Sequence, residues 1–252
     1  MKTKNIAIIT SSFRDPSGFV FIYKNQIYRQ INKIYKHHYE HLMGSGLYTE
    51  LVKKGLLIEH KEVKSIKALT DECYKIIQPE KIEFISYPYE WCFSQFKDAA
   101  LLTLEIQKTA LKYGMILKDA SAYNVQFKNG KPIWIDTLSF EKYEQGKPWV
   151  AYRQFCQHFF APLVLMCYTD VRLSQILKIY IDGIPLDLAS RLLPYHSWLK
   201  LPVLFHIHLH SRGEKYLATK EFKKAYTKKI SYNELMGIIE NLELYIITKL
   251  NW

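Results

Sequence analysis

Residues 117–141 read LKDASAYNVQFKNGKPIWIDTLSFE, and they carry the strongest signal for a fold in this chain. Short runs of β-branched and aromatic residues alternate with polar turns, which predicts strand, loop, strand, turn and strand, with the turn at the KNG of residues 128–130. Asp119, Asn124 and Asp136 then lie in the loop and at strand ends. Because carboxylate and amide oxygens are ligands of hard cations, the stretch predicts a site for a metal and an anionic ligand.

The spacing of these three residues resembles the protein-kinase-like superfamily. In that superfamily a catalytic-loop Asp is followed five residues later by Asn, and a metal-binding Asp ends a strand about a dozen residues further on. Here Asn124 follows Asp119 by five residues, and Asp136 follows Asn124 by twelve. The resemblance implies Asp119 as base or orienter of an acceptor hydroxyl, with Asn124 and Asp136 as ligands of Mg²⁺ beside ATP.

The chain departs from that superfamily's pattern at three places. Lys118 stands before the loop Asp where Arg or Gly is usual, and we expect it to steady the transferring phosphate or a substrate anion. DTL replaces Asp-Phe-Gly at residues 136–138. No G-x-G-x-x-G loop is present, so the turn RDPSG at residues 14–18 is the candidate to cover the phosphates, through Ser17 and Gly18.

Arg29, in the run QIYRQIN, stands where the superfamily has a third-strand lysine. We expect Arg29 to contact the phosphates of the nucleotide and to pair with a helix carboxylate, Glu50 being the better candidate and Glu40 the other. Arginine binds phosphate through two N–H groups and is bulkier than lysine. A nucleotide would therefore not be bound at Arg29 with the same geometry as at a lysine. An active kinase and a degenerate nucleotide binder therefore both stay open.

The hydrophobic period of the sequence changes near residue 92. Before it, GFVFIYKNQIYRQIN predicts a hairpin joined at Lys24, Asn25 and Gln26, and residues 35–55 predict a helix broken by the Gly-Ser-Gly of residues 44–46. Residues 80–91, EKIEFISYPYEW, predict a strand that ends at Pro88.

After residue 92 the pattern is mainly helical. Residues 94–114 have apolar side chains at helical spacing, with Ser94 placed to cap the helix and Gly114 to end it. From Trp149 onward the helical pattern continues to the end. We therefore expect an α+β, protein-kinase-like fold of two lobes: a strand-rich lobe at residues 1–91 and a helical lobe at residues 92–252.

Residues 86–92 are the expected extended crossing between the lobes. Tyr87, Tyr89 and Trp91 alternate as on a strand, which favours core and hinge packing over a platform for stacked bases. In the kinase-like interpretation the backbone of residues 86–90, with Tyr87 and Tyr89, lies against the adenine of the nucleotide.

The composition excludes several classes of protein. A chain of 252 residues with 48% hydrophobic and 15% aromatic residues can bury a core and is not disordered, and a net charge of +11 favours anionic partners. Four scattered cysteines without a C-x-x-C pair suggest neither zinc nor disulfides, so we expect a reduced, cytoplasmic protein. The apolar runs are too short for a signal peptide or for the roughly 20 residues of a membrane span.

Two further segments allow alternatives. The segment HIHLH at residues 206–210 has two interpretations. As a strand it would place His206, His208 and His210 on one face, as in a metal site. As a helix it would distribute them around the axis, and the helix is the favoured interpretation. The basic run at residues 211–229 is typical of a solvated helix face, with binding to nucleic acid or an acidic surface as the lesser alternative.

A second resemblance covers nearly the whole chain. Segments such as FRDPSGFVF, SGLYTELV, GMILKDASAYNVQF, PWVAYRQFCQHFFAPL and LLPYHSWLKLPVLFHIHLH resemble the N-terminal region of bacterial proteins related to the nodulation protein NoeA. Those proteins are usually described as SAM-dependent methyltransferases because of a second, C-terminal domain. The resemblance implies that this chain, ending at Trp252, is the kinase-like part without the methyltransferase.

Two functions follow from these patterns. The first is an ATP- and Mg²⁺-dependent phosphotransferase that acts on a small hydroxylated acceptor. The second is a catalytically silent, kinase-like binding or specificity module for a methyltransferase, on the same chain or on another.

Overall fold

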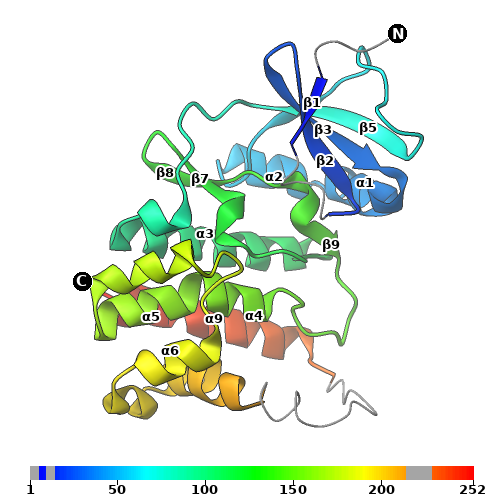
Figure 1. Cartoon of the computed structure of the whole chain (residues 1–252). Coiled ribbons are helices and arrows are strands. Elements are labelled where there is room, and N and C mark those ends of the chain that lie inside the picture. Colours follow the sequence, from blue (N-terminus) through cyan, green and yellow to red (C-terminus); the bar gives the residue numbers. More distant parts are fainter. Residues whose placement is uncertain (1–5, 10–14, 214–228) are drawn as a thin grey trace, which may run out of the picture.

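The computed structural model describes residues 6–9, 15–213 and 229–252. Its upper part is an antiparallel five-stranded sheet, and its lower part is made mostly of helices (Figure 1). The strands of the sheet lie in the order β1-β2-β3-β5-β4. Their bounds are β1 (Ile6–Ile8), β2 (Gly18–Tyr23), β3 (Gln26–Asn32), β4 (His60–Glu62) and β5 (Cys73–Pro79).

The predicted hairpin is confirmed as β2 and β3. Lys24 and Asn25 form its turn with φ angles of 48° and 61°, and Tyr23 pairs with Gln26. Two positive φ angles match the tight turns whose twist suits a two-residue hairpin. Gln26 therefore belongs to the strand and not to the turn. The hairpin places Arg29 opposite Val20 on one side and opposite Ile77 of β5 on the other.

Two short helices follow β3 and lie below the sheet in Figure 1, after the turn η2 (Lys33–Tyr35). They are α1 (Lys36–Gly44) and α2 (Leu47–Lys53), and the predicted break between them is confirmed. Gly46 makes the break possible, because its φ of 91° is one that side chains with a Cβ rarely adopt.

The strand predicted at residues 80–91 is wrong. The strand of this region comes earlier, as β5, whose Ile76 and Ile77 are buried. Residues 80–87 are a loop, and Pro88 starts the turn η3 (Pro88–Glu90), where its fixed φ suits a first helical position. The crossing between the sheet and the helices is therefore irregular rather than extended.

The predicted long helix is confirmed as α3 (Phe93–Lys112). Its cap is Cys92 rather than Ser94, because the Gln95 side chain accepts a hydrogen bond from the Cys92 N–H at 3.0 Å. Gly114, with a φ of 69°, ends the helix as expected. The buried face of α3 forms the centre of the largest core cluster.

The short strands predicted around the 117–141 stretch are confirmed. They form two pairs, β6 (Met115–Leu117) with β9 (Phe140–Lys142) and β7 (Val125–Lys128) with β8 (Lys131–Trp134). Asn129 and Gly130 form the turn of the second pair with φ angles of 52° and 76°. The turns η4 (Ala122–Asn124) and η5 (Thr137–Ser139) lie between these strands.

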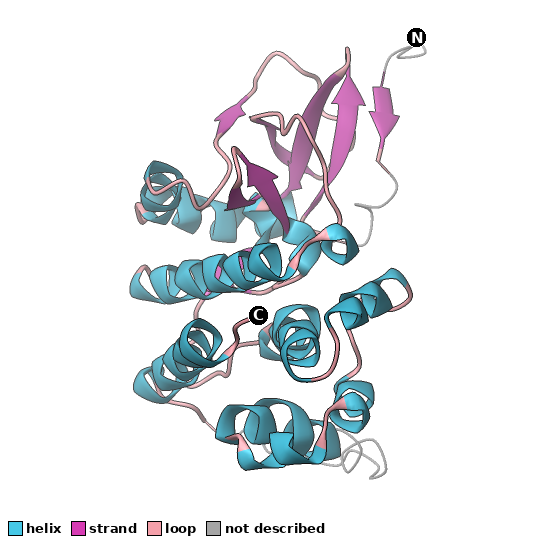
Figure 2. Ribbon diagram, turned by 90° about the vertical axis from the view of Figure 1, so that its left-hand side faces the viewer, coloured by secondary structure: helices cyan, strands magenta, loops and turns pink. Residues whose placement is uncertain are grey.

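The described residues after Trp149 are helices and turns, as expected, and Figure 2 shows them stacked away from the sheet. The arrangement is α+β and compatible with a two-lobed fold. Among the described residues, no helix is long and apolar enough to cross a membrane. Most of the basic run, residues 214–228, lies outside the described residues. The helical elements are α4 (Tyr152–Phe155), η6 (Cys156–Phe160), α5 (Ala161–Tyr168), η7 (Val171–Lys178), α6 (Leu186–Leu192), η8 (Tyr195–Leu199), α7 (Leu201–Val203), η9 (Leu204–Leu209) and α9 (Tyr232–Lys249).

Candidate functional site

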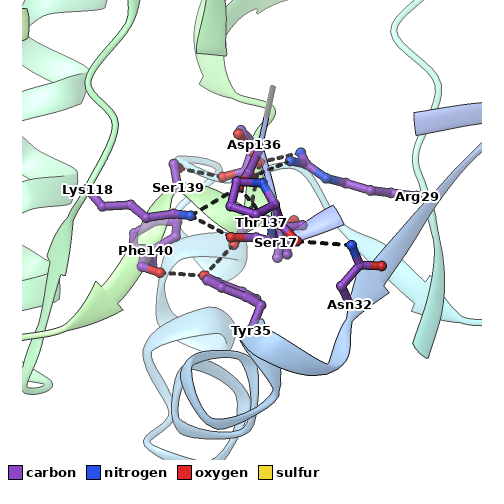
Figure 3. A network of polar contacts seen from close by, with 12 residues as sticks. Ser17, Arg29, Asn32, Tyr35, Lys118, Asp136, Thr137, Ser139 and Phe140 are labelled. Atoms are coloured by element: carbon purple, nitrogen blue, oxygen red, sulfur yellow. Dashed lines mark hydrogen bonds and ion pairs between the residues drawn. The ribbon is translucent and has the colours of Figure 1, made fainter. Parts of the chain in front are cut away.

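Charged side chains from four separate segments meet below the sheet, where it faces the 117–141 stretch (Figure 3). Arg29 comes from β3, Lys118 follows β6, Asp136 follows β8, and Asp15 lies in the turn before β2. They are brought together by the fold alone, because more than a hundred residues of sequence separate Asp15 from Lys118. This cluster is the candidate site.

Arg29 is the centre of the cluster. Its Nη1 donates a hydrogen bond to Oδ1 of Asp136, and its Nη2 lies 3.4 Å from Oδ2 of Asp15. The side chain is only 13% exposed, and its Nε has no partner in the part of the chain that the structure describes. A buried N–H donor without a partner costs free energy, so it indicates a place where a ligand acceptor would be favoured.

Lys118 brings the second positive charge. Its backbone N–H donates to the Ser139 carbonyl at 2.8 Å, which aligns it at the end of the β6–β9 pair. Its Nζ donates to Oγ of Ser17 at 2.7 Å and lies 3.4 Å from Oδ1 of Asp15 (Figure 3). The same Nζ lies 5.1 Å from the centre of the Tyr35 ring, a position that favours a cation.

The turn at residues 15–18 is fixed from two sides. Within the turn, the Ser17 N–H donates to Oδ1 of Asp15 at 2.9 Å. Aspartates in turns commonly accept such a hydrogen bond from the backbone two residues further on. Asn32, at the end of β3, donates from its N–H to the Ser17 carbonyl at 2.8 Å and from Nδ2 to the Pro16 carbonyl at 3.0 Å. Ser17 therefore lies in a turn beside the charged cluster, and Lys118 donates to its hydroxyl. Arg14 of the predicted turn lies outside the described residues.

Gly18 has a steric role. A Cβ at this position would lie 2.0 Å from the Gln30 carbonyl oxygen and 2.9 Å from Cδ1 of Leu138. Only glycine lets the start of β2 approach β3 and the η5 turn so closely. Gly18 thus sets the distance between the turn and the residues that follow Asp136.

Asp136 is held in one orientation. Its Oδ1 accepts a hydrogen bond from the Leu138 N–H at 2.8 Å, and its carbonyl accepts from Oγ of Ser139 at 2.6 Å and from Nε1 of Trp134 at 3.1 Å. Leu138 is fully buried in a cluster with residues of β3, α1 and β5. Among the described residues, nothing donates to Oδ2 of Asp136, so this oxygen is available to a cation.

The loop of Asp119 and Asn124 is joined to Asp136 through the backbone. Oδ1 of Asp119 accepts from the Ser121 N–H at 2.9 Å, and the Asn124 carbonyl accepts from the Ile135 N–H at 2.8 Å. Ile135 directly precedes Asp136, so the two predicted metal ligands are on neighbouring, hydrogen-bonded segments. Nδ2 of Asn124 is buried and has no partner among the described residues.

No group of three His, Cys, Asp or Glu side chains is placed to hold a metal in the described ranges. A metal at this site would therefore rest on Asp136 and Asn124 and take its other ligands from a nucleotide and water. That set suits Mg²⁺, which usually binds one or two carboxylates together with substrate phosphates.

Tyr35 and His60 support the turn that follows Asp136. The buried hydroxyl of Tyr35 donates to the Phe140 carbonyl, and burial, reinforced by the charge of Asp136, raises the pKa of Tyr35 well above its usual value. His60 lies between the Tyr39 hydroxyl, 3.0 Å from its Nε2, and Oγ1 of Thr137, 3.5 Å from its Nδ1. Burial lowers the pKa of His60 to about 4, so it is neutral at pH 7.

The predicted pairing of Arg29 with a helix carboxylate is wrong. Glu50 lies on α2 and pairs with Lys54 at 3.0 Å. Glu40 lies on α1, where it pairs with Lys36 at 3.8 Å and accepts from the Tyr74 hydroxyl at 2.9 Å. Each carboxylate pairs with a lysine one turn away on its own helix, whereas Arg29 contacts Asp136 and Asp15.

The segment at residues 86–90 does not have the open backbone that an adenine would need. Gln126 of β7 binds both backbone groups of Ser86, donating to its carbonyl and accepting from its N–H, each at 3.0 Å. The Tyr87 N–H donates to Glu90 at 2.8 Å, and the Tyr89 carbonyl accepts from Gln175 at 2.7 Å. The prediction that this backbone recognises adenine is therefore not supported.

The aromatic residues of that segment have different roles. Trp91 is 3% exposed and donates from Nε1 to Oγ of Ser86 at 2.9 Å, so its predicted packing role is confirmed. Tyr87 and Tyr89 stack on each other, with ring centres 5.5 Å apart and planes 9° apart. Tyr87 remains 45% exposed.

The sequence pattern does not indicate two residues, Asp15 of the site and Gln126 beside the crossing segment. Asp15 lies in the turn RDPSG, and Asp-Pro-Ser-Gly is a turn signature, so its sequence signal is that of a turn. Gln126 is 4% exposed on β7, and a lone polar residue in a short apolar strand was its only signal.

The HIHLH segment is helical, as favoured, and the three histidines do not share one face: His206 and His210 lie against Tyr152, and His208 lies elsewhere. His206 contacts the Tyr152 hydroxyl, whereas His208 lies between Oγ of Ser190 at 2.8 Å and Oγ of Ser197 at 2.9 Å. His210 stacks on the Tyr152 ring, 5.4 Å between centres. His206 and His208 are buried, 7% and 0% exposed, and have the contacts of packed core residues.

Fold and site together define an α+β chain with a partly buried cluster of two cations and two carboxylates, contributed by the sheet and by the 117–141 stretch. Comparison with known proteins adds a relationship. The chain is 33% identical to the nodulation protein NoeA of Rhizobium meliloti (strain 1021) over 201 residues, which are 79% of this chain and 42% of NoeA. This homology supports a NoeA-related family, while the chain spans less than half the length of that relative. No model of a known protein family matches the chain.

Proposed function

We propose that this chain has a protein-kinase-like fold, binds ATP with Mg²⁺ between its strand-rich and helical parts, and transfers phosphate to a small hydroxylated acceptor. The observation that carries the proposal is the position of Asp136. Asp136 follows β8 and has one carboxylate oxygen without a donor among the described residues. The preceding residue, Ile135, is hydrogen-bonded to Asn124, and Asp136 itself accepts a hydrogen bond from Arg29. Phosphoryl transfer requires mainly such positioned charges.

Each residue of the cluster has a proposed role. Asp136 and Asn124 bind Mg²⁺, and Arg29 and Lys118 neutralise the oxygens of the phosphates. The Ser17 hydroxyl adds a hydrogen bond at the turn that covers them. Asp119 accepts the proton of the acceptor hydroxyl, or orients it.

We place the base of the nucleotide against residues 81–85 instead of residues 86–90. Residues 81–85 lie in the loop between β5 and the turn η3, and in the described chain their backbone makes no hydrogen bond. Base recognition through open backbone groups is therefore available there. The stacked Tyr87 and Tyr89 rings then border that segment.

A second candidate is a catalytically silent module that serves a methyltransferase. The contact of Arg29 with Asp136 favours it, because this ion pair ties up the residue that would bind Mg²⁺. In this alternative the charged cluster is a structural link between the sheet and the η5 turn, and nucleotide has no effect.

Thermal unfolding with ATP and Mg²⁺ separates the two candidates. A ligand at 100 times its dissociation constant stabilises a protein that it binds only when folded by about 2.7 kcal/mol. We expect that stabilisation for the wild type and its loss in Arg29→Gln. Arg172→Gln is the matched control, because Arg172 makes a comparable ion pair with Asp170 on the surface, at 2.6 Å.

Release of ADP above a protein-free blank, with water or a panel of hydroxylated acceptors, then tests transfer. A wild type that binds ATP without any release of ADP would contradict phosphate transfer and leave a nucleotide-binding protein without transferase activity. A wild type without any response to ATP would contradict the kinase and favour the silent module.

A further inference from the structure

We infer that the Asp15 carboxylate occupies the place of a phosphate group and must leave it before an anionic ligand binds. The inference rests on the proposed function, in that it concerns the same site. It names Asp15 as an internal competitor of the nucleotide's phosphates, a role that the spacing of the catalytic-type loop does not indicate.

The geometry of Asp15 is that of a bound anion. Its two oxygens face different cations: Oδ1 lies 3.4 Å from Nζ of Lys118, and Oδ2 lies 3.4 Å from Nη2 of Arg29. Oδ1 also accepts from the Ser17 N–H at 2.9 Å. Two cations and a backbone N–H around one oxyanion are the groups that bind phosphate in proteins.

The charges of the cluster cancel. Arg29 and Lys118 carry two positive charges, and Asp15 and Asp136 carry two negative charges within the contacts described above. A polyphosphate that approached this arrangement would meet no net positive charge. Moving Asp15 away leaves one positive charge in excess, which is the attraction a phosphate needs.

Asp15 is the most exposed member of the cluster. Its side chain is 28% exposed, against 25% for Lys118, 13% for Arg29 and 15% for Asp136, and both of its ion pairs are 3.4 Å long. Its one shorter contact is the hydrogen bond from the Ser17 N–H, at 2.9 Å. The rest of the turn is bound independently, since Asn32 holds Pro16 and Ser17 and Lys118 donates to Ser17 at 2.7 Å. Rotation of the Asp15 side chain therefore opens the position without loss of the turn.

The class of ligand follows from the donors that would lose their acceptor when Asp15 moves away. Nη2 of Arg29, Nζ of Lys118 and the Ser17 N–H are three donors around the two oxygens of Asp15. Nε of the same guanidinium is buried and has no partner among the described residues. These groups suit a phosphate oxygen of a nucleotide or of pyrophosphate. A neutral ligand would gain nothing from displacing a carboxylate.

Asp15→Asn tests the inference, because asparagine keeps the size and the turn-forming oxygen of Asp15 and removes its charge. Calorimetry measures the binding of pyrophosphate and of ATP with Mg²⁺ to the wild type, to Asp15→Asn and to Asp170→Asn. Asp170→Asn cuts another Asp–Arg pair, on the surface. We expect Asp15→Asn to bind pyrophosphate about tenfold more tightly than the wild type, since loss of two partly exposed ion pairs amounts to roughly that factor. Asp170→Asn is expected to match the wild type.

The outcomes separate this inference from the proposed function. Tighter pyrophosphate binding in Asp15→Asn supports the inference even if the wild type does not bind ATP, in which case the proposed function fails by itself. Equal or weaker binding in Asp15→Asn, or no binding by either protein, overturns the inference; binding of ATP and Mg²⁺ by the wild type would leave the proposed function intact. Asp15→Ser, which also favours turns, is the second variant if Asp15→Asn does not fold.

Discussion

Arg29 and Asp136 form an ion pair across 107 residues of sequence. Arg29 lies in the third strand of the sheet, and Asp136 directly follows β8 in the other part of the molecule. The pair therefore connects the two parts at the candidate site. Because Oδ1 of Asp136 accepts from both Arg29 and the Leu138 N–H, any cation must bind the remaining oxygen, Oδ2.

Asp136→Asn is the first test of the metal role. Asparagine keeps an oxygen for the Leu138 N–H and removes the charge that Mg²⁺ needs, so we expect the fold to remain and magnesium-dependent ATP binding to be lost. The unfolding free energy should fall by only about 1 kcal/mol, the usual contribution of one partly buried ion pair. Calorimetry with ATP, with and without Mg²⁺, measures the effect.

The control for Asp136→Asn is Asp170→Asn, which removes an aspartate charge outside the cluster. Magnesium should raise the ATP affinity of the control as it does for the wild type. Equal magnesium dependence in Asp136→Asn and the wild type would contradict the assignment of Asp136 as a ligand.

Gly18→Ala is expected to destabilise the protein. Its Cβ would overlap the Gln30 carbonyl oxygen and press on Leu138, and overpacking of this kind typically costs about 1–3 kcal/mol. Gly44→Ala is the matched control, since a Cβ there meets nothing within 4 Å and alanine favours a helix. Urea unfolding of both variants measures the difference, and equal stabilities would show that β2 can move away from β3 without loss.

Local sequence signals predicted most of the elements that position the site. The hairpin at Lys24 and Asn25, the long helix and the two strand pairs are each indicated by a hydrophobic period and by turn residues. Both signals depend only on residues a few positions apart in the sequence. The prediction of a strand at residues 80–91 is wrong, because a run of apolar and aromatic residues does not show whether a sheet edge is available for it to pair with. Here Pro88 instead starts a helical turn.

The partners of the site residues were less predictable, because they depend on distances through space. The spacing of Asp119, Asn124 and Asp136 predicted neighbouring segments, and the hydrogen bond from Ile135 to Asn124 agrees with it. No pattern indicated that Arg29 would turn toward Asp136 rather than to Glu50. Arg29 contacts Asp136 and Asp15, and Glu50 pairs with Lys54 on its own helix. Sequence period does not determine either set of partners.

Acid should destabilise the protein through its buried histidines. Burial lowers the pKa of His60 and of His158 from 6.5 to about 4 in the folded state. Between pH 6.5 and pH 4 the unfolded chain therefore binds more protons than the folded one, so the unfolding free energy falls as the pH falls through this window. Each histidine contributes at most about 3 kcal/mol, at 1.36 kcal/mol for each unit of pKa difference.

Urea unfolding from pH 7.5 to pH 4.5 measures this dependence. His60→Gln should make the slope shallower, because glutamine does not titrate, although it also weakens the contacts with Tyr39 and Thr137 at every pH. His196→Gln, at an exposed position of η8, is the control and should keep the slope of the wild type. A slope in His60→Gln as steep as that of the wild type would show that His60 is not the source.

Asp119→Asn should affect transfer and leave nucleotide binding nearly unchanged. Asp119 acts on the acceptor hydroxyl in the proposed mechanism, whereas Asp136, Asn124 and Arg29 contact the nucleotide and its metal. Asparagine can still accept the hydrogen bond from the Ser121 N–H, so the loop should keep its conformation. General-base catalysis contributes roughly 10²- to 10⁴-fold, and we expect the rate of ADP release to fall by that factor while calorimetry gives the same ATP affinity. A variant that loses ATP binding and turnover together would show that Asp119 belongs to the nucleotide site, and a variant with the turnover of the wild type would remove Asp119 from the mechanism.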